Sequence, residues 1–396
     1  MLEALALLLA GVHFALPLAY YLYAKTVWLP KPWNLKLDEA YKPKATIILP
    51  TYNEARLIAD RLDNIYAQDY PRELTEVIVI DSASTDGTPE IVEEWAKRHS
   101  DLPLKLIRES ARRGKAHALN HALKHATGEV IVIADADALW PPDALSKAVK
   151  LLSDPTVGAV SCLKKPANPG PASVEKEYRG YYNVMRVAES KAYATPIFHG
   201  ELAAFKAELL RRAGGFPTDV GADDSHTATK IALMGFRAII PDDLWIEERA
   251  PKESYFTWRV RRAQHLLQHF AKILKAKRTP NKFKRILLVE CYLHLVNPWL
   301  SAVATTMFSV SSLLHHSSTA IAMLAFGPLL LALKPYRTWM ATTTLLEPEP
   351  SMLITGVGYA FFSLCEARGD TIIRIVADVV FPHVIDYAMC LRGLAV

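Results

Sequence analysis

Two aspartates separated by a single alanine, Asp135 and Asp137, directly follow the apolar run at residues 129–134. Two carboxylates this close at the end of a strand repel each other unless a cation lies between them. Hard divalent ions prefer such oxygen ligands and often share them with the phosphate oxygens of a substrate. The triplet therefore predicts a divalent metal that bridges the oxygens of a diphosphate.

Two further polar segments follow apolar runs of the same kind. Residues 50–54 (PTYNE) come at the end of the run 45–50, and residues 81–88 (DSASTDGT) come after the run 76–80. Taken alone, the second segment equally fits an ordinary turn followed by a helix cap, because Asp, Ser and Gly favour turns. Neither segment by itself identifies a ligand site.

The elements that must position these segments alternate along the chain. The β-branched apolar runs predict strands, and the stretches between them predict helices at 54–68, 88–98 and 115–125. The order β-α-β-α-α-β predicts an α/β, Rossmann-like fold whose mostly parallel sheet is covered on both faces. Ligands of such sheets gather at the carboxyl ends of the strands, where the polar segments fall.

Charged residues at the expected starts of two later helices are further candidates. Lys115 follows Gly114 and could bind an anion with the help of the helix dipole, although a solvated basic turn is the alternative. Asp223 and Asp224 precede a helix that ends near residues 234–236. An N-cap with an acid favoured by the helix dipole is the plain alternative for that pair.

Two other segments add candidates near the end of the globular part. Within residues 196–206 (PIFHGELAAFK), Gly200 allows a ligand to approach closely, but a buried turn explains it nearly as well. We interpret His199 as a structural donor rather than a catalyst. Arg261 and Arg262 are suited to stabilising a diphosphate through their guanidinium groups.

The three strand ends, in this order and spacing, resemble those of the family 2 glycosyltransferases, whose nucleotide-sugar domain has the GT-A fold. The resemblance covers residues 45–270. It implies a hexosyltransferase in which Asp137 ligates Mg²⁺ or Mn²⁺ and Asp135 faces the ribose or the donor sugar. Residues 113–120 match the family's Gly-Lys-Ala-x-Ala-Leu-Asn helix start beside the donor. The residues that the resemblance implies at the donor nucleotide are Thr51, Tyr52, Glu54, Asp81 and Lys115.

The same resemblance assigns the acceptor side. It places Gly200 near the acceptor and Asp224 at the general base, because the family's acidic pair opens a helix that closes on a glycine, as Gly235 does here. Asp224 would take the proton of the acceptor hydroxyl during displacement with inversion, and Asp223 beside it is a cap and substrate-site candidate. The arginine cluster lacks the Gln-x-x-Arg-Trp signature of membrane-bound relatives such as cellulose synthases. The missing tryptophan favours the addition of one sugar over polymer synthesis.

Hydrophobic residues make up 51% of the 396 residues, which is high for a wholly soluble protein. Residues 2–23 are long enough to span a bilayer, and the lysines after them predict a cytoplasmic globular domain. A cleaved secretory signal is the alternative. Residues 256–270 predict an interfacial amphipathic helix. Three or four more spans are expected among residues 287–314, kinked at 297–298, 319–333, 352–365 and 372–389.

We therefore expect a multi-pass protein of the cell membrane. Its parts are an N-terminal transmembrane helix, a cytosolic catalytic domain, interfacial helices and a C-terminal transmembrane region, at 1–27, 40–250, 251–285 and 286–396. The basic residues at 272–285 suit phospholipid head groups better than nucleic acid. We expect a lipid-linked glycan as acceptor and GDP-mannose as donor, with UDP-glucose or UDP-N-acetylglucosamine as alternatives. A non-catalytic scaffold and a transporter are the alternatives from other classes of protein.

Overall fold

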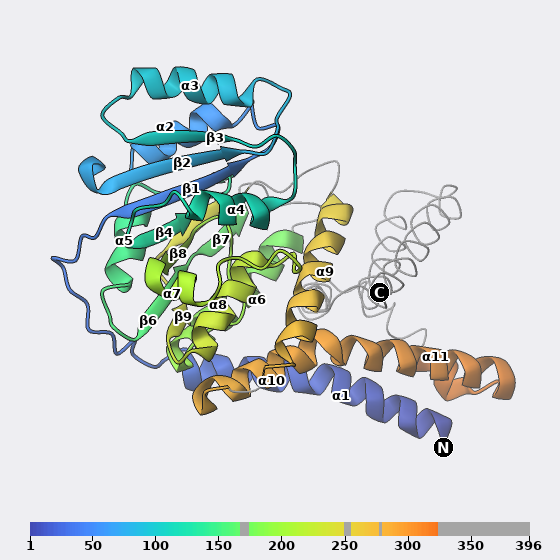
Figure 1. Cartoon of the computed structure of the whole chain (residues 1–396). Coiled ribbons are helices and arrows are strands. Elements are labelled where there is room, and N and C mark those ends of the chain that lie inside the picture. The colour runs from blue at the N-terminus through green and yellow to red at the C-terminus, as the bar shows by residue number, and fades with distance from the viewer. Residues whose placement is uncertain (167–173, 249–254, 277–278, 324–396) are drawn as a thin grey trace. The chain divides into compact units, whose positions relative to one another are not determined.

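The computed structural model describes residues 1–166, 174–248, 255–276 and 279–323. The chain divides into two compact units (Figure 1). The larger unit is Tyr21–Cys291, and the smaller one combines Met1–Tyr20 with the chain from Tyr292 onward.

The strands, in chain order, are β1 (Ala45–Thr51), β2 (Thr75–Asp81), β3 (Leu104–Arg108), β4 (Val130–Ile133), β5 (Ala138–Leu139), β6 (Val157–Ser161), β7 (Leu163–Pro166), β8 (Ala203–Lys206), β9 (Arg237–Ile239) and β10 (Trp245–Glu248). The helices are α1 (Leu2–Tyr23), α2 (Ile58–Tyr66), α3 (Thr88–Arg98), α4 (Lys115–Leu123), α5 (Ala144–Leu151), α6 (Val174–Ala192), α7 (Ala207–Arg212), α8 (Asp223–Leu233), α9 (Tyr255–Ile273), α10 (Asn281–Leu295) and α11 (Asn297–His315). Two short helical turns complete the elements, η1 (Ala24–Trp28) and η2 (Arg72–Leu74).

The larger sheet has seven strands in the order β3-β2-β1-β4-β8-β6-β9. Its neighbours pair in parallel except at β8, which is antiparallel to both β4 and β6. The chain crosses over through α5 to reach β6, and β8 later fills the space between β4 and β6 in the reverse direction. A mostly parallel α/β sheet, as expected from the sequence, is confirmed. A second sheet of three strands has the order β5-β10-β7.

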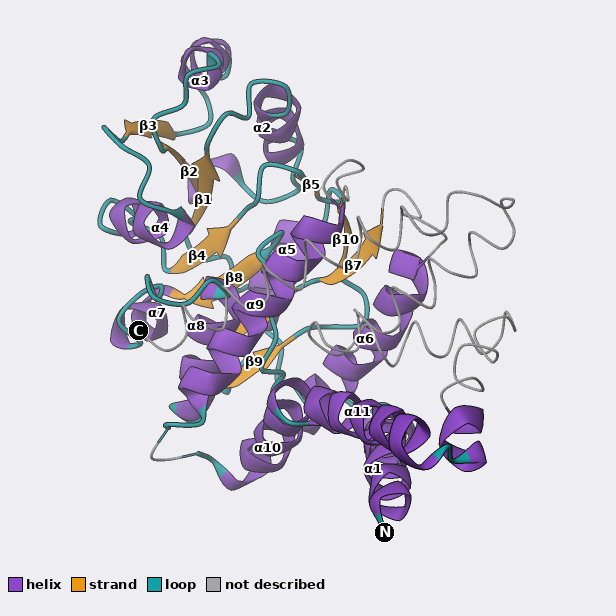
Figure 2. Ribbon diagram, turned by 90° about the vertical axis from the view of Figure 1, so that its right-hand side faces the viewer, coloured by secondary structure: helices purple, strands orange, loops and turns teal. Residues whose placement is uncertain are grey.

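Both faces of the large sheet are buried. All residues of β1 from Ala45 to Leu49 are buried, which is typical of a strand covered on both sides. Ile47 and Leu49 belong to a hydrophobic core that includes residues of α2, α3 and α5. Figure 2 shows α2 and α4 on opposite sides of the sheet. This layering leaves the carboxyl ends of β1, β2 and β4 together at one edge.

The helix expected at 54–68 begins later than predicted. Asn53 has a left-handed φ of 57°, and the amides of Leu57 and Ile58 both bond the carbonyl oxygen of Glu54. The turn uses residues that the pattern assigned to the helix, and it keeps Glu54 beside the end of β1. The other two expected helices are confirmed as α3 and α4, the second slightly shorter than predicted.

The smaller unit is built from apolar helices. His13 Nδ1 lies 3.0 Å from the carbonyl oxygen of Asn297, whose Nδ2 donates to the carbonyl oxygen of His13 at 3.3 Å. Within the described residues, two helical stretches are long and apolar enough to cross a membrane, Leu2–Trp28 and Asn281–His315. The second stretch is interrupted before Pro298, as predicted. The spans expected at 352–365 and 372–389, and most of 319–333, lie outside the described residues.

Candidate active site

The carboxyl ends of β1 and β2 lie side by side, with Thr51 opposite Asp81 in the strand register. Asp81 is only 2% exposed. Its carboxylate accepts hydrogen bonds from Thr51 Oγ1 at 3.2 Å and from the amide and hydroxyl of Ser84 at 2.9 and 2.5 Å. These donors replace the water that the buried carboxylate has lost, and they fix its direction.

The loops that follow β1 and β2 are bonded to each other. The amide of Asn53 donates to Ser84 Oγ at 2.8 Å, and the amide of Thr85 donates to Asn53 Oδ1 at 2.9 Å. The amide of Glu54 donates to Thr88 Oγ1 at 2.9 Å. We call these two loops the paired loops. The structure thus brings together the first two polar segments that the sequence singled out.

Tyr52 lies in the first of these paired loops, and 38% of its surface is exposed. The guanidinium carbon of Arg112 lies 3.9 Å from the centroid of the Tyr52 ring. An exposed ring of this kind offers a face on which a planar group such as a nucleobase can stack. Sequence reasoning missed Arg112, although the basic residues before Gly114 were a signal that could have found it.

Acidic side chains crowd around the Asp135-Ala136-Asp137 loop. Burial, together with the negative charges of Asp137, Asp86 and Asp135, raises the pKa of Glu54 to about 7. Repulsion between these carboxylates would be relieved by a cation bound among them.

The residues present fit a divalent cation that also binds the substrate. Asp137 is exposed, whereas Asp135 is half-buried. Over the described parts of the chain, no group of three or more Asp, Glu, His or Cys side chains is arranged to hold a metal by itself. Ions such as Mg²⁺ are often held by one or two carboxylates and complete their shell with phosphate oxygens and water. The substrate would have to supply the remaining ligands here.

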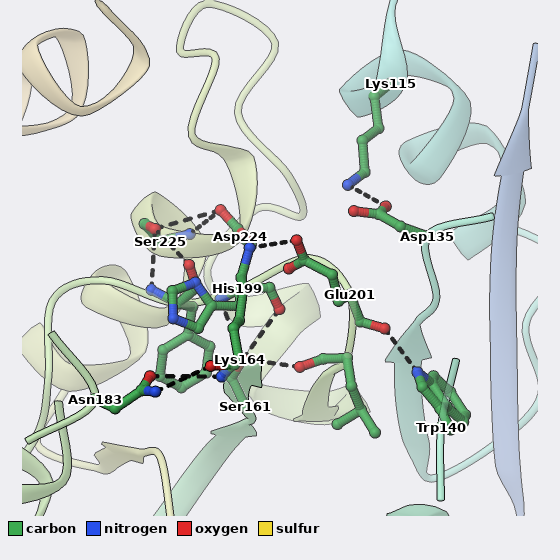
Figure 3. Close-up of polar contacts among 12 residues, drawn as sticks. Lys115, Asp135, Trp140, Ser161, Lys164, Asn183, His199, Glu201, Asp224 and Ser225 are labelled. Carbon is green, nitrogen blue, oxygen red and sulfur yellow. Dashed lines mark hydrogen bonds and ion pairs between the residues drawn. The ribbon is translucent and has the colours of Figure 1, made fainter. Parts of the chain in front are cut away.

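Lys115, Asp135 and Asp224 converge on Gly200. Lys115 Nζ lies 2.6 Å from Asp135 Oδ1 (Figure 3). A Cβ atom on Gly200 would lie 2.7 Å from Lys115 Nζ, 3.0 Å from Asp135 Oδ2 and 3.4 Å from Asp224 Oδ2. Only a hydrogen fits at this position without displacing the ion pair. Gly200 is therefore the point at which the residues predicted for the donor meet the predicted base.

The charged groups of this cluster shift one another's pKa values. Burial raises the pKa of Asp224, and the positive charge of Lys115 opposes that rise. Burial, opposed by Lys115 and reinforced by Asp224, raises the pKa of Asp223 to about 7. Burial disfavours the charged form of Lys115, but Asp135, Asp223 and Asp224 hold its pKa above its usual value. Lys115 thus stays protonated, and the carboxylates of Asp223 and Asp224 are more basic than usual.

The helix that carries the acidic pair begins at Asp223, and its N-cap residue is Ala222. The prediction that Asp223 caps this helix is wrong, because α8 starts early enough to place both acids in its first turn. Asp224 Oδ1 accepts the amide of Ser225 at 2.6 Å. Ser225 Oγ in turn accepts the amide of Phe198 at 3.0 Å, which ties the start of α8 to the segment leading to the glycine.

The chain on either side of Gly200 is firmly held. Ser161 Oγ accepts the amide of His199 at 3.1 Å and donates to its carbonyl oxygen at 3.0 Å, and the His199 residue is 8% exposed. This main-chain bonding suits the structural interpretation of His199. Glu201 forms an ion pair with Lys164 of β7, and Figure 3 shows both side chains beside Asp224. Sequence reasoning missed this pair, because no local pattern joins residues of separate elements.

Arg61 of α2 was also missed. Burial lowers its pKa to about 9, although the charges of Asp135 and Asp137 oppose the shift. Its guanidinium carbon lies 4.3 Å from the centroid of the Trp140 ring, and Nη1 donates to Asn64 Oδ1 at 2.5 Å. Asn64 also bonds the main-chain amide and carbonyl of Trp140, so this group fixes the chain just after the acidic triplet. Its position on the apolar face of an amphipathic helix was the signal that could have identified Arg61 from the sequence.

Arg261 and Arg262 lie on α9, close to the loop that precedes α8. A Cβ atom on Gly221 would lie 2.0 Å from the ring of His265, which shows how closely this helix approaches the loop. Burial, followed by the charges of Arg261, Arg262 and Lys115, lowers the pKa of His265 to about 4. The two arginines and Lys115 therefore act electrostatically on the same side chain.

Residues 46–214 match a family model described as "Glycosyl transferase family 2". The poly-beta-1,6-N-acetyl-D-glucosamine synthase of Staphylococcus epidermidis is 26% identical over 234 residues, which cover 57% of this chain and 55% of that protein. The synthase of the same name from Staphylococcus aureus strain COL is 29% identical over 262 residues, which cover 64% of this chain and 62% of that protein. The chain thus aligns with less than two thirds of the length of these synthases.

Among solved structures, the mannosyltransferase PcManGT from Pyrobaculum calidifontis, in complex with GDP-Man and Mn²⁺, is similar with a TM-score of 0.81. The sequences are 57% identical, and the similarity covers 90% of this chain and 99% of that chain. The likeness therefore extends over almost the whole of that enzyme, in sequence as well as in fold.

Proposed function

Because the chain belongs to glycosyltransferase family 2, has its GT-A fold and is a hexosyltransferase, we propose that it transfers one mannose from GDP-mannose to a lipid-linked glycan. The observation that carries this proposal is the convergence of Lys115, Asp135 and Asp224 on Gly200. It puts a charge pair suited to the donor next to a buried carboxylate suited to the acceptor. Reaction is favoured when both reactants are held in contact in this way.

GDP-mannose is preferred as the donor on the strength of similarity. The mannosyltransferase solved with GDP-Man shares 57% of its sequence with this chain, whereas the N-acetylglucosamine polymer synthases share 26 and 29% over part of their length. The alignment with the synthases supports a second candidate, transfer from a UDP-sugar. The two candidates differ in the base and in the sugar, so a donor panel separates them.

The paired loops are assigned to bind the nucleoside of the donor. Asp81, oriented by Thr51 and Ser84, can accept hydrogen bonds from the base or the ribose. Tyr52 offers its ring face to the base, and the carboxyl group of Glu54 is close enough to Asp135 and Asp137 for their charges to raise its pKa.

The diphosphate and the sugar are assigned to the charged residues around the Asp135-Ala136-Asp137 loop. Asp137 would hold Mn²⁺ or Mg²⁺, which supplies positive charge to the diphosphate when bound. Asp135 is placed to orient the ribose or the sugar, and Lys115 carries a protonated amine beside it. Arg261 and Arg262 add positive charge from α9. Charge stabilisation of this kind helps the nucleotide to leave.

Asp224 is assigned as the general base. Its carboxylate would take the proton of the acceptor hydroxyl while the oxygen forms its bond to the anomeric carbon and the bond to the diphosphate oxygen breaks. Attack from the side opposite the leaving nucleotide inverts the configuration at that carbon. The raised pKa of Asp224 suits this task, because a more basic carboxylate accepts a proton more readily. Asp223 lies beside it on the same helix turn.

A membrane location is supported by the exposed apolar helices. Only 17% of the most apolar stretch of Leu2–Trp28 is buried, and Leu8 is 62% exposed. Leu313 in α11 is 75% exposed. Such surfaces are stable in lipid rather than in water. We propose on this basis a membrane anchor at 1–27 and a membrane region at 286–396, with a catalytic domain at 40–250 and interfacial helices at 251–285. The lysines that follow the anchor favour the cytoplasmic side for the catalytic domain.

The experiment that tests this function uses the full chain in detergent or in proteoliposomes with Mn²⁺. Radiolabelled GDP-mannose, UDP-glucose and UDP-N-acetylglucosamine are each offered with dolichyl phosphate, a dolichyl-diphosphate-linked disaccharide, or free mannose as acceptor. We expect label to move from GDP-mannose to a lipid-linked product, and transfer to stop when the metal is chelated. Transfer from a UDP-sugar alone would replace the donor, and transfer to free mannose alone would replace the acceptor.

A further inference from the structure

Lys164 is a buried lysine that the mechanism above does not use. It lies in β7, and its side chain is 1% exposed. Its ammonium pairs with Glu201, whose side chain is 7% exposed. A buried ion pair gives up the hydration of both charges, and it is a poor source of stability compared with apolar packing.

Both partners are held by their surroundings. The main-chain carbonyl of Glu201 accepts a hydrogen bond from Trp140 Nε1 at 2.8 Å. The carbonyl of Lys164 accepts one from Asn183 Nδ2 of α6 at 3.0 Å. Ser161 bonds the main chain just before Glu201. The main chains that carry the two charges are thus fixed in place (Figure 3).

The pair lies next to the assigned base. Figure 3 shows the amine of Lys164 directed toward the carboxylates of Glu201 and Asp224. The positive charge of Lys164 acts to lower the pKa of Asp224. Lys115 and Asp135 also act on Asp224 electrostatically, and Asp223 precedes it in the first turn of α8. Figure 3 shows His199 and Glu201 nearby, whereas Arg261, Arg262 and His265 on α9 are linked to this cluster through Lys115.

We propose that Glu201 and Lys164 are positioning residues for the general base: Glu201 holds the ammonium of Lys164 and so limits its pull on the carboxylate of Asp224. This inference rests on the proposed function, because it needs Asp224 to act as the base. A direct Lys164–Asp224 ion pair would make Asp224 a poor proton acceptor. A lone Glu201 beside Asp224 would instead keep Asp224 protonated to higher pH. The intact pair avoids both extremes.

The two halves of the pair therefore have opposite effects on the pH profile. The rate falls at low pH as the base becomes protonated, so the acid limb of kcat follows the pKa of Asp224 in the complex. Glu201→Gln leaves the charge of Lys164 to act on Asp224, and the acid limb should move to lower pH by about one unit. Its plateau should fall about threefold, because the base is weaker. Lys164→Met leaves the negative charge of Glu201, and the acid limb should move to higher pH by a similar amount.

The experiment measures kcat for mannose transfer against pH with the full chain, Mn²⁺ and saturating GDP-mannose. The acceptor is whichever of the three compounds offered above receives mannose. If none does, the acceptor is water, and the rate is followed by the release of GDP. The variants are Lys164→Met, Glu201→Gln, the double variant with both changes, and the charge-preserving Lys164→Arg and Glu201→Asp. Lys206→Met, which removes a half-buried lysine of β8 that bonds the carbonyl of Asp154, is the matched control. Thermal unfolding and the KM for GDP-mannose report on the fold and on the donor site.

The inference is supported if the acid limb moves in opposite directions in the two single variants. The double variant, the two charge-preserving variants and the control should then stay near the native profile. Shifts in the same direction, or lower rates with an unmoved acid limb, would overturn it and leave the pair a purely structural role. If one single variant fails to fold, the other still decides, because each has its own expected direction and an acid limb that stays or moves the other way overturns the inference. Failure of the native chain to release GDP at any pH would overturn the proposed function itself.

Discussion

The amine of Lys115 lies 2.6 Å from a carboxylate oxygen of Asp135, so the first residue of α4 is joined to the loop that follows β4. Gly114 makes this possible, because its φ of 99° lies in the region that favours glycine and turns the chain into the helix. The ion pair fixes the position of a positive charge at this edge of the sheet.

Lys115→Met should weaken the binding of GDP-mannose about tenfold and lower kcat about a hundredfold, because a fixed cation near the diphosphate is lost. Isothermal titration and initial-rate kinetics measure the two effects. Lys147→Met removes a lysine that pairs with Asp143 on the surface, and it should change neither quantity. Native donor affinity and native transfer in Lys115→Met would contradict the assigned role.

Asp224→Asn should bind GDP-mannose with nearly native affinity, yet transfer should fall by about two to four orders of magnitude, the usual contribution of a general base. Asp219→Asn, which alters an exposed acid that pairs with Lys272, is the control. Transfer that survives within about tenfold would show that another group is the base.

Asp137→Ala should lose the part of the GDP-mannose affinity that depends on Mn²⁺, because the exposed carboxylate is the assigned metal ligand. Titrations with Mn²⁺ and with chelator, on the native chain and on the variant, isolate this part. Asp143→Ala offers a matched change at another acid. Equal dependence on the metal in native and variant chains would remove Asp137 from the metal site.

Gly200→Ala should leave the chain folded and reduce transfer about a hundredfold, since displacement of catalytic groups by about 1 Å has costs of this size. The added methyl group would lie 2.7 Å from the flexible end of Lys115 and 3.0 Å from that of Asp135, both of which can move aside.

Gly180→Ala is the matched control for this variant, because nothing lies within 4 Å of the added carbon in α6. It should raise the free energy of unfolding by about 0.5–1 kcal/mol and keep full activity. A Gly200→Ala variant as active as Gly180→Ala would show that the close approach at this glycine is dispensable.

The sequence predicted the parts of the fold that depend on local pattern. The apolar runs that became β1, β2 and β4 and the glycine before Lys115 all carry short-range signals, and the structure brings their polar ends together. The turn at Asn53 was not predicted, because its left-handed backbone has no periodic signature.

Contacts between distant parts of the chain were harder to predict. β8 reverses direction between β4 and β6, and nothing in its own residues encodes which neighbours it will have. The Lys164–Glu201 pair depends on that placement, because β8 follows directly on the segment that carries Glu201. Arg61 showed a local signal, an arginine on an apolar helix face, but its partner Trp140 lies far along the chain, just after β5.

The paired loops hold each other in place. Asn53 and Glu54 of one loop are bonded to Ser84, Thr85 and Thr88 of the other. The protein's own hydrogen bonds therefore restrict the conformational entropy of these loops as the chain folds. Ligands that meet a preorganised surface keep more of their interaction energy as affinity. Under the proposed function, the nucleoside half of the donor would anchor the molecule while the sugar end remained free to adjust against Asp135.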